Sequence, residues 1–346
     1  MKCGTPTATV FGSRRRWLIG VVVVFILIGT WFVRDDLRDA LRSLLHADAE
    51  WVMFAIPVLM CWYLAWSAVH LFSRRMVDVF QPRTDVFRLL PATAASIALN
   101  LVAKSAGLAG MASFLARAHR RGEPRGRAIA AYLLATVLTE VGFVVVLLIA
   151  LVSVASDGHL TVTETIAASV FAVYTASRLG LLAVAARSRT LLRRLWSLPR
   201  RAIDRLLRRP PQPPNTETPD ELYEAVALAR RRPWSAVPSL LAAVGVDLCA
   251  VVMLWAAILA ITGENRPAAA FAAYGVSSLF GIVGFLPGGI GFVEVGGVAL
   301  LVGAGLTAPA ATAVMLLYRA FDFWIPLAVG GLSSFWLGRR PREVAA

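Results

Sequence analysis

Charged residues are scarce in this 346-residue sequence, where they make up 16% of the chain while 58% is apolar. A soluble domain of this length would carry more charge, and the mean hydropathy of +0.68 argues against that class. The apolar residues also come in long runs, as they do in a bundle of membrane helices. The net charge of +14 does not indicate a nucleic-acid-binding domain, because the lysines and arginines lie between the apolar runs.

Cysteines and catalytic motifs are also lacking. Cys3, Cys61 and Cys249 are the only cysteines; they have no metal-binding spacing and imply no disulfide framework. The sequence contains no GxSxG, HExxH or P-loop motif and no pair of carboxylates that would line a cleft. Residues 35–39 match the DDxxD pattern of magnesium–diphosphate sites, but the pattern occurs once and is better explained as a solvated helix start. We therefore expect no enzyme active site, no cofactor and no metal.

A helix needs about 20 apolar residues to cross a bilayer. Six runs reach or nearly reach this length: residues 17–33, 51–72, 128–152, 165–186, 236–262 and 308–337. Two further apolar stretches, 89–115 and 268–304, are interrupted by glycines and polar residues. The sequence thus predicts an all-α, polytopic integral membrane helix bundle of about eight transmembrane elements, in a single domain over residues 1–346.

Lysine and arginine are distributed unevenly between the predicted loops. Of the 35 basic residues, 28 lie in the N-terminal tail, in segments 73–88, 116–127 and 187–235, and after residue 337. Only four lie in segments 34–50, 153–164 and 263–267. Because loops rich in lysine and arginine stay in the cytoplasm, the first set and both termini are predicted to be cytoplasmic.

This charge distribution predicts two re-entrant hairpins. Stretch 89–115 lies between two cytoplasmic segments, so it should enter and leave the membrane on the same face. Stretch 268–304 lies between an outer loop and the last span, so it should start and end on the outer face, with its turn at Pro287-Gly288-Gly289. Broken hairpins that enter from opposite faces are typical of transporters with inverted repeats. The alternative is that the second stretch forms two short spans and one loop is assigned to the wrong side.

The basic segment 187–235 has its own pattern. Residues 190–209 combine leucines, a tryptophan and seven arginines, which favours an amphipathic helix lying on an anionic membrane surface. Prolines at 210–214 then form a linker. Thr218 and Glu221 have the spacing of a capping box, with Pro219 at the first helical position, and predict a short helix that ends near Arg232.

Charges inside a membrane are costly, so each is a candidate functional residue. The apolar runs contain seven: Lys104, Glu140, Arg178, Asp247, Glu294, Arg319 and Asp322. Arg319 and Asp322 are three residues apart, so they share a helix face and can pair. Glu140 needs a partner, for which Lys104 or Arg319 is available, and Asn100 lies one helical turn before Lys104. A buried ion-pair network and direct contact with a substrate both explain these charges.

The region from Pro287 to Glu294 is the strongest local motif. Its glycines, Gly288, Gly289 and Gly291, leave backbone N–H groups open at the start of a helix, where they can meet an anion such as a phospholipid head group. Glu294 lies in the first turn of that helix, where a carboxylate complements the helix dipole.

This motif and the later Tyr318-Arg319 pair resemble the lysylphosphatidylglycerol synthase transmembrane-region family, also described as flippase-like. The usual family pattern is a PGGxGxxE turn followed by a YR pair in the last span, and both are present. The segment from Asn100 to Gly107 resembles the first hairpin of the family, although Leu108 stands where glutamate is usual. Glu140 resembles the acidic member of an ER pair, in which Val141 replaces the arginine.

The resemblance implies a plasma-membrane protein that moves or handles an anionic or modified phospholipid. The best-known members also carry a soluble synthase domain; this sequence resembles only the transmembrane half, so lysine transfer to lipid is not expected. The expected partners are a phospholipid and an anionic membrane surface, with no nucleic acid; formation of a homo-oligomer stays open. Two alternatives stay open as well: an accessory or glycosyl-transferring protein of lipid-linked glycan synthesis, and a transporter of a small amphipathic solute.

Overall fold

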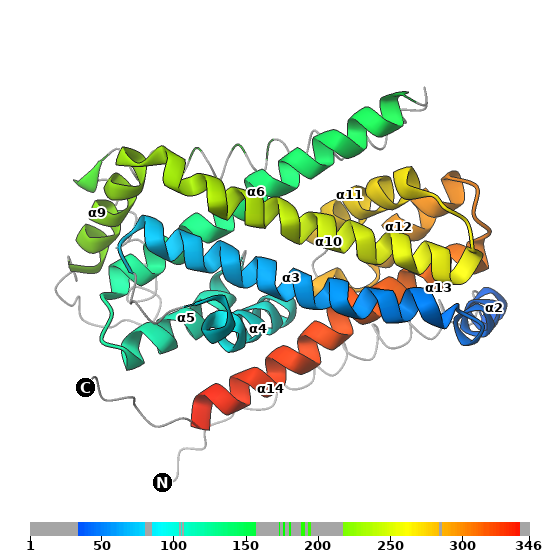
Figure 1. Cartoon of the computed structure of the whole chain (residues 1–346), viewed down its shortest axis with the longest axis horizontal. Coiled ribbons are helices and arrows are strands. Elements are labelled where there is room, and N and C mark those ends of the chain that lie inside the picture. The colour runs from blue at the N-terminus through cyan, green and yellow to red at the C-terminus, as the bar shows by residue number, and fades with distance from the viewer. Residues whose placement is uncertain are drawn as a thin grey trace, which may run out of the picture.

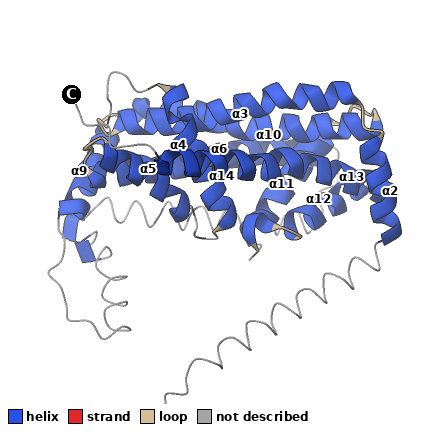
Figure 2. Ribbon diagram, turned by 90° about the horizontal axis from the view of Figure 1, so that it is seen from below, coloured by secondary structure: helices blue, strands red, loops and turns tan. Residues whose placement is uncertain are grey.

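A computed structural model describes most of the chain as helices joined by short turns (Figure 2). The described residues are 34–79, 85–103, 105, 107–156, 217–283 and 286–339, with isolated residues 173, 176, 180, 188–190, 193 and 194. Within these residues there is no strand, which confirms the all-α prediction.

Four of the described helices are long and apolar enough to cross a membrane: Ala49–Met76, Arg125–Ile149, Pro233–Thr262 and Ala308–Trp336. The corresponding elements are α3 (Ala49–Met76), α6 (Arg125–Ser156), α10 (Val237–Thr262), and the last span, which consists of α13 (Ala308–Arg319), the π-helical turn η3 (Ala320–Trp324) and α14 (Ile325–Arg339). These confirm four of the six predicted spans. The other two, 17–33 and 165–186, lie outside the described residues except for isolated positions 173, 176 and 180, so the total of about eight elements stays a prediction.

Helices α3 and α10 run antiparallel through the centre of the bundle (Figure 1). At one end, the backbone N–H of Asp48 donates to the carbonyl of Ala260 over 2.8 Å; at the other, the hydroxyls of Ser73 and Ser239 are 3.0 Å apart. We call these the Asp48 end and the Arg74 end. Helix α10 supplies several fully buried apolar side chains, and it therefore forms the middle of the core.

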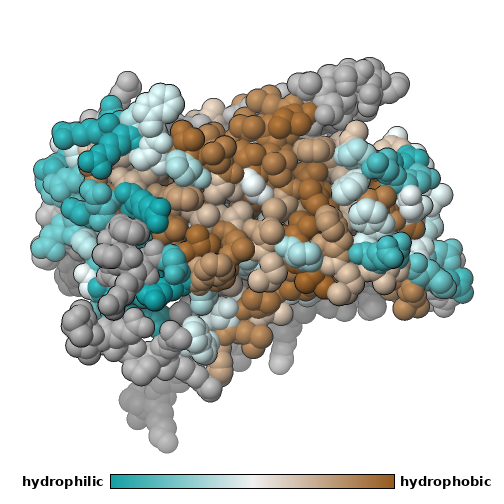
Figure 3. Space-filling model, in the orientation of Figure 1, coloured by the Kyte–Doolittle hydropathy of each residue, from teal (hydrophilic) through white to brown (hydrophobic). Residues whose placement is uncertain are grey.

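The surface has the apolar belt that a bilayer requires. Figure 3 shows a broad hydrophobic band across the middle of the molecule, with hydrophilic residues at both ends. Large apolar side chains of the long helices are exposed, among them Met53, Leu148 and Leu332. Such a continuous apolar surface would be unfavourable in water and is stable in lipid, so the chain is a multi-pass membrane protein.

The first predicted hairpin is present as α4 (Val86–Val102) and α5 (Leu108–Arg120). Gly107 precedes α5 with a φ of 86°, a left-handed conformation that glycine adopts without strain. Both feet of the hairpin lie at the Arg74 end: the Arg117 guanidinium donates to the Arg88 carbonyl over 3.2 Å, and Arg74 pairs with Glu123 just after α5. The segment therefore returns to the end from which it started, as the charge distribution predicted.

The second predicted hairpin is also present, as α11 (Pro267–Val283), the turn η2 (Pro287–Gly289) and α12 (Phe292–Gly303). Its turn lies at the predicted Pro-Gly-Gly position. Its feet are joined by a hydrogen bond from the Arg266 guanidinium to the Ala304 carbonyl, beside the Asp48 end. The two hairpins thus enter the bundle from opposite ends, as α4 and α11 do in Figure 1.

Helix α4 of the first hairpin contacts both α14 and the η2 turn of the second hairpin. Gly330 of α14 permits the close approach, because a Cβ atom there would lie 2.2 Å from the Ala94 carbonyl oxygen and 2.5 Å from Ala98 Cβ. The two hairpins therefore meet at the segment that contains Pro287–Gly289.

The open end of the first hairpin and that of the second should differ in their accessibility from outside the cell. In a cysteine-free background, Glu264→Cys should react with a membrane-impermeant maleimide in intact cells, because Glu264 is exposed at the Asp48 end. His119→Cys, exposed at the Arg74 end, should react only after the cells are opened. Labelling at position 119 in intact cells would show that the first hairpin does not return to the cytoplasm.

Candidate functional site

The η2 turn is built by glycines in left-handed conformations. Gly288, Gly289 and Gly291 have φ angles of 58°, 67° and 84°. At Gly288 there is also no room for a side chain, because a Cβ atom would lie 2.0 Å from the Phe323 ring. The turn thus interrupts the hairpin and presses its backbone against the last span; Gly289 is buried, whereas Pro287 and Ile290 on either side are exposed.

Arg319, the last residue of α13, reaches this turn. Its Nε donates to Glu294 Oε1 over 2.8 Å, its Nη1 to Asp322 Oδ2 over 3.1 Å, and its Nη2 to the Gly288 carbonyl over 3.0 Å. The guanidinium also lies over the Phe323 ring, 4.5 Å from its centroid. Glu294 in turn accepts the Gly291 N–H over 2.6 Å, which fixes its position in the first turn of α12.

We call Gly288, Glu294, Arg319 and Asp322 the Arg319 cluster. The Arg319 side chain is only 3% exposed, whereas those of Glu294 and Asp322 are 25% and 28% exposed. Two carboxylates thus neutralise one guanidinium. These carboxylates, and not the guanidinium, form the accessible edge of the cluster. Tyr318, the residue before Arg319, is buried in the core. The protein itself supplies the counter-charge of Arg319, so a bound anion is not required to keep this arginine paired.

The cluster confirms one pairing predicted from sequence and adds two contacts. Arg319 and Asp322 pair as their spacing predicted. Glu294 joins them from 25 residues away, and the Phe323 ring lies beneath the guanidinium. The contact with the Phe323 ring had no signal of its own in the sequence, because it depends on the wide π-helical turn that follows Arg319.

The residues predicted in the first half of the chain lie elsewhere. Asn100 holds the first hairpin together: its Oδ1 accepts the Gly110 N–H over 2.7 Å, and its Nδ2 donates to the Tyr132 hydroxyl over 3.1 Å. Tyr132 itself donates to the Gly107 carbonyl over 2.6 Å. Glu140 lies half-buried on α6, and the ion pairs of Arg319 go to Glu294 and Asp322 instead. Lys104 and Arg178 fall outside the described residues.

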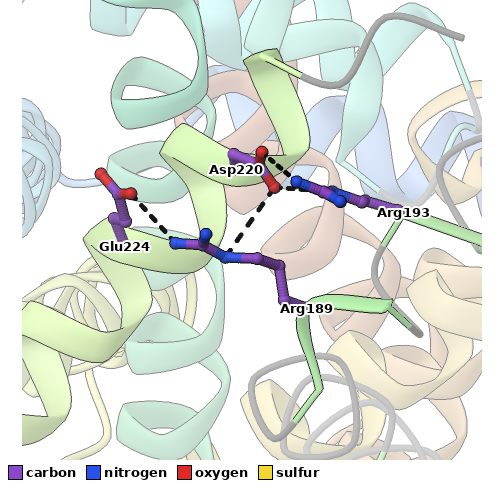
Figure 4. Close-up of polar contacts among 4 residues, drawn as sticks. All are labelled: Arg189, Arg193, Asp220 and Glu224. Carbon is purple, nitrogen blue, oxygen red and sulfur yellow. Dashed lines mark hydrogen bonds and ion pairs between the residues drawn. The ribbon is translucent and has the colours of Figure 1, made fainter.

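A second charged cluster lies on the helix predicted after the basic segment, α9 (Glu217–Arg231). Figure 4 shows two arginines of that segment reaching it: Arg193 hydrogen-bonds Asp220, with its Nε 2.8 Å away, and Arg189 lies 3.0 Å from Glu224. The hydrogen bond from Arg193 lowers the pKa of Asp220 below its usual range, so the contact persists in mild acid. This exposed cluster attaches the basic segment to the bundle.

The predicted capping box is wrong. Helix α9 begins at Glu217, one residue before Thr218, and the Glu221 carboxylate accepts the Gly126 N–H at the start of α6 over 2.7 Å. Gly126 is pressed so closely against α9 that a Cβ atom would lie 2.4 Å from Glu221 Cβ. The amphipathic helix predicted at 190–209 lies almost entirely outside the described residues. Residues 35–39 begin helix α2 (Arg34–Leu45), and no group of three or more metal-binding side chains occurs in the described part of the chain.

Replacing Gly288 with alanine should destabilise the turn. The left-handed backbone alone should cost an alanine about 1–2 kcal/mol, and the methyl group would collide with the Phe323 ring. Gly331→Ala is the matched control, because Gly331 is helical with open space around it, and it should leave the melting temperature in detergent unchanged or raised. Combining Gly288→Ala with Phe323→Ala should recover only the stability that is lost through the steric clash, and not the cost of the left-handed backbone. A Gly288→Ala protein as stable as wild type would show that this turn can rearrange.

Comparison with known proteins agrees with this geometry. No curated protein matches the sequence. The family described as Lysylphosphatidylglycerol synthase TM region matches residues 17–330, which include the first three described spans, most of the last one, both hairpins and the Arg319 cluster. The chain therefore belongs to the lysylphosphatidylglycerol synthase transmembrane-region family.

Proposed function

We propose that this protein moves an anionic or modified phospholipid between the leaflets of the plasma membrane, with both of its termini in the cytoplasm. Membership of the family and the apolar belt support a role in handling membrane lipid. The observation that carries the proposal is the Arg319 cluster: a buried arginine on a broken helix, held by two partly accessible carboxylates beside the turn where two hairpins from opposite ends meet. Charges in such a position are expensive and are typical of a substrate pathway.

The cluster suggests how a head group would be handled. An isolated arginine in the membrane interior is unfavourable, so Arg319 must stay paired at every stage. A lipid phosphate can take the place of one carboxylate, since Glu294 and Asp322 are each partly accessible while Arg319 is not. The exchange keeps the guanidinium neutralised and requires no covalent chemistry. A bidentate arginine–phosphate contact would then orient the head group against the glycine turn.

The first hairpin would form the opposite wall of the pathway. Helix α4 contacts the η2 turn, and Asn100 ties the end of α4 to the start of α5. Lys104 follows in the same connection and would supply a second positive group for a phosphate, with Glu140 as its counter-charge. A lipid could reach the Arg319 cluster from either end by passing one hairpin or the other.

The test is lipid translocation by the purified full chain. It should be reconstituted in vesicles of phosphatidylethanolamine and phosphatidylglycerol that contain a trace of head-group-accessible fluorescent phosphatidylglycerol. Dithionite, which bleaches only the outer leaflet, should then remove most of the fluorescence, compared with about half in protein-free vesicles. Bleaching that stops at the protein-free level would refute the proposal, provided that the protein is folded in the vesicles. The same assay with a fluorescent phosphatidylethanolamine measures head-group selectivity.

A further inference from the structure

The two halves of the last span pack on different parts of the protein. In the described part of the chain, and apart from the turn η3 between them, α13 has its extensive contacts with α2, α10 and α12, whereas α14 has its own with α4 (Figure 1). Helix α14 fits closely on α4, because a Cβ atom on Gly330 would lie 2.2 Å from the Ala94 carbonyl oxygen. The last span therefore joins a unit that contains the second hairpin to a unit that contains the first.

The turn between these halves, η3, lacks part of the ordinary hydrogen bonding of a helix. Its π-helical form is wider than an α-helix, and the Ile325 N–H accordingly donates to the Ala320 carbonyl, five residues back. Pro326 follows directly and has no N–H group to donate. Two consecutive residues thus lack the usual hydrogen bond to the fourth residue before them, and a helix kinks most readily at such a point.

The same turn carries part of the Arg319 cluster. Asp322 in the turn pairs with Arg319, and the centroid of the Phe323 ring lies 4.5 Å from the guanidinium carbon. The ring also touches the second hairpin, since a Cβ atom on Gly288 would lie 2.0 Å from it. Phe323 is 3% exposed and fills the space between the arginine and the glycine turn. Conversion of η3 to an α-helical turn would rotate its residues, move this ring and uncover one face of the guanidinium.

We propose that η3 is the hinge of the last span and that Phe323 is the gate of the Arg319 cluster. Helices α14 and α4 move as one unit relative to a second unit of α12, α13 and the η2 turn. Helix α3 packs on α4 and α10 packs on α13, so this central pair is the frame against which both units move. The surface that opens is the contact between α4 and the η2 turn, beside the cluster.

The hinge gives lipid translocation a moving part, and here the inference rests on the proposed function. With the hinge closed, Phe323 covers one face of the guanidinium, and Glu294 and Asp322 accept its N–H groups. When the hinge opens, the ring moves away and the η2 turn separates from α4, so a lipid phosphate gains access to Arg319. A lipid that binds the open state more tightly than the closed state shifts the protein toward the open state.

The first experiment measures the hinge without any lipid assay. Pairs of spin labels should be attached to the cysteine-free full chain in vesicles of phosphatidylethanolamine and phosphatidylglycerol. Exposed positions are available: Leu332 on α14 with Val302 on α12 reports across the hinge, and Leu332 with Val102 on α4 reports within one unit. We expect two distances for the pair across the hinge, one distance for the pair within the unit, and a shift of the first pair toward one distance in Pro326→Ala. A single distance across the hinge in the wild-type background would overturn the proposal, as would two distances whose populations Pro326→Ala leaves unchanged.

The second experiment tests the role of the hinge in vesicles that contain fluorescent phosphatidylglycerol. Pro326→Ala restores a backbone donor and introduces a better helix former, so the melting temperature in detergent should rise or stay unchanged. Translocation should nevertheless slow by up to about tenfold, which is the factor that one ordinary hydrogen bond contributes to an equilibrium. Pro57→Ala is the matched control, because Pro57 also lies inside a membrane-spanning helix but is exposed on α3, outside the Arg319 cluster, and it should keep the wild-type rate.

A folded Pro326→Ala protein that moves lipid at the wild-type rate would show that translocation does not use the hinge. Absence of any wild-type translocation would count against the proposed function instead, and the spin-label distances would then decide the hinge alone.

Discussion

Replacing Arg319 with methionine should abolish lipid translocation and also lower the stability of the protein. The substitution leaves Glu294 and Asp322 facing each other without a positive charge, and the Gly288 carbonyl loses its donor. Removing one partner from a buried pair typically costs about 3–5 kcal/mol. The translocation rate in vesicles and the melting temperature in detergent should be measured on the same preparation.

The two effects can be separated with further substitutions. Arg319→Met combined with Glu294→Gln and Asp322→Asn removes all three charges, so most of the stability should return. Translocation should not return, because no guanidinium remains to hold a phosphate. Arg319→Lys keeps the charge but loses the planar fork that contacts three groups, and it should retain only part of the activity. Arg319→Met protein that translocates lipid at the wild-type rate would remove Arg319 from the pathway.

The hairpins and their turn could be predicted from sequence because they depend on local signals. The charge distribution requires 89–115 to return to its starting face, and Pro287-Gly288-Gly289 can only be a turn in a segment that is otherwise apolar. The Arg319–Asp322 pair follows from helical spacing for the same reason. Each of these predictions needs no knowledge of which helices are neighbours.

The contacts that sequence could not predict join distant segments. Glu221 fits a local capping box, but packing of α9 on α6 offers it the Gly126 N–H, and that contact takes precedence. Asp247 could have met any polar group on four neighbouring helices; it meets Tyr274 because α10 and α11 cross at that level. The sequence offered Arg319 as one partner of Glu140, whereas α12 places Glu294 2.8 Å from Arg319. The sequence identifies which charged residues lie inside apolar runs, where burial is costly. Helix packing then decides which partner each of them meets.

Removing either partner of the Arg74–Glu123 pair should cause a large loss of stability with no direct effect on the lipid site. Arg74 Nη2 donates to both Glu123 oxygens over 2.6 and 2.7 Å, and the two side chains are 3% and 5% exposed. The pair connects the end of α3 to the return of the first hairpin. Arg74→Met or Glu123→Leu should each cost about 3–5 kcal/mol, because one charge remains buried without its partner.

The double substitution Arg74→Met with Glu123→Leu gives the decisive comparison. It leaves no buried charge, so the melting temperature should return close to that of wild type or exceed it, as happens when a buried ion pair is replaced by apolar side chains. Arg88→Met is the matched control, because the Arg88–Asp85 pair is exposed and separated by 3.9 Å, and should change stability by less than about 1 kcal/mol. If the double variant is as unstable as the single ones, the pair would be required for the geometry of the hairpin foot, and the cost would not come from an unpaired charge.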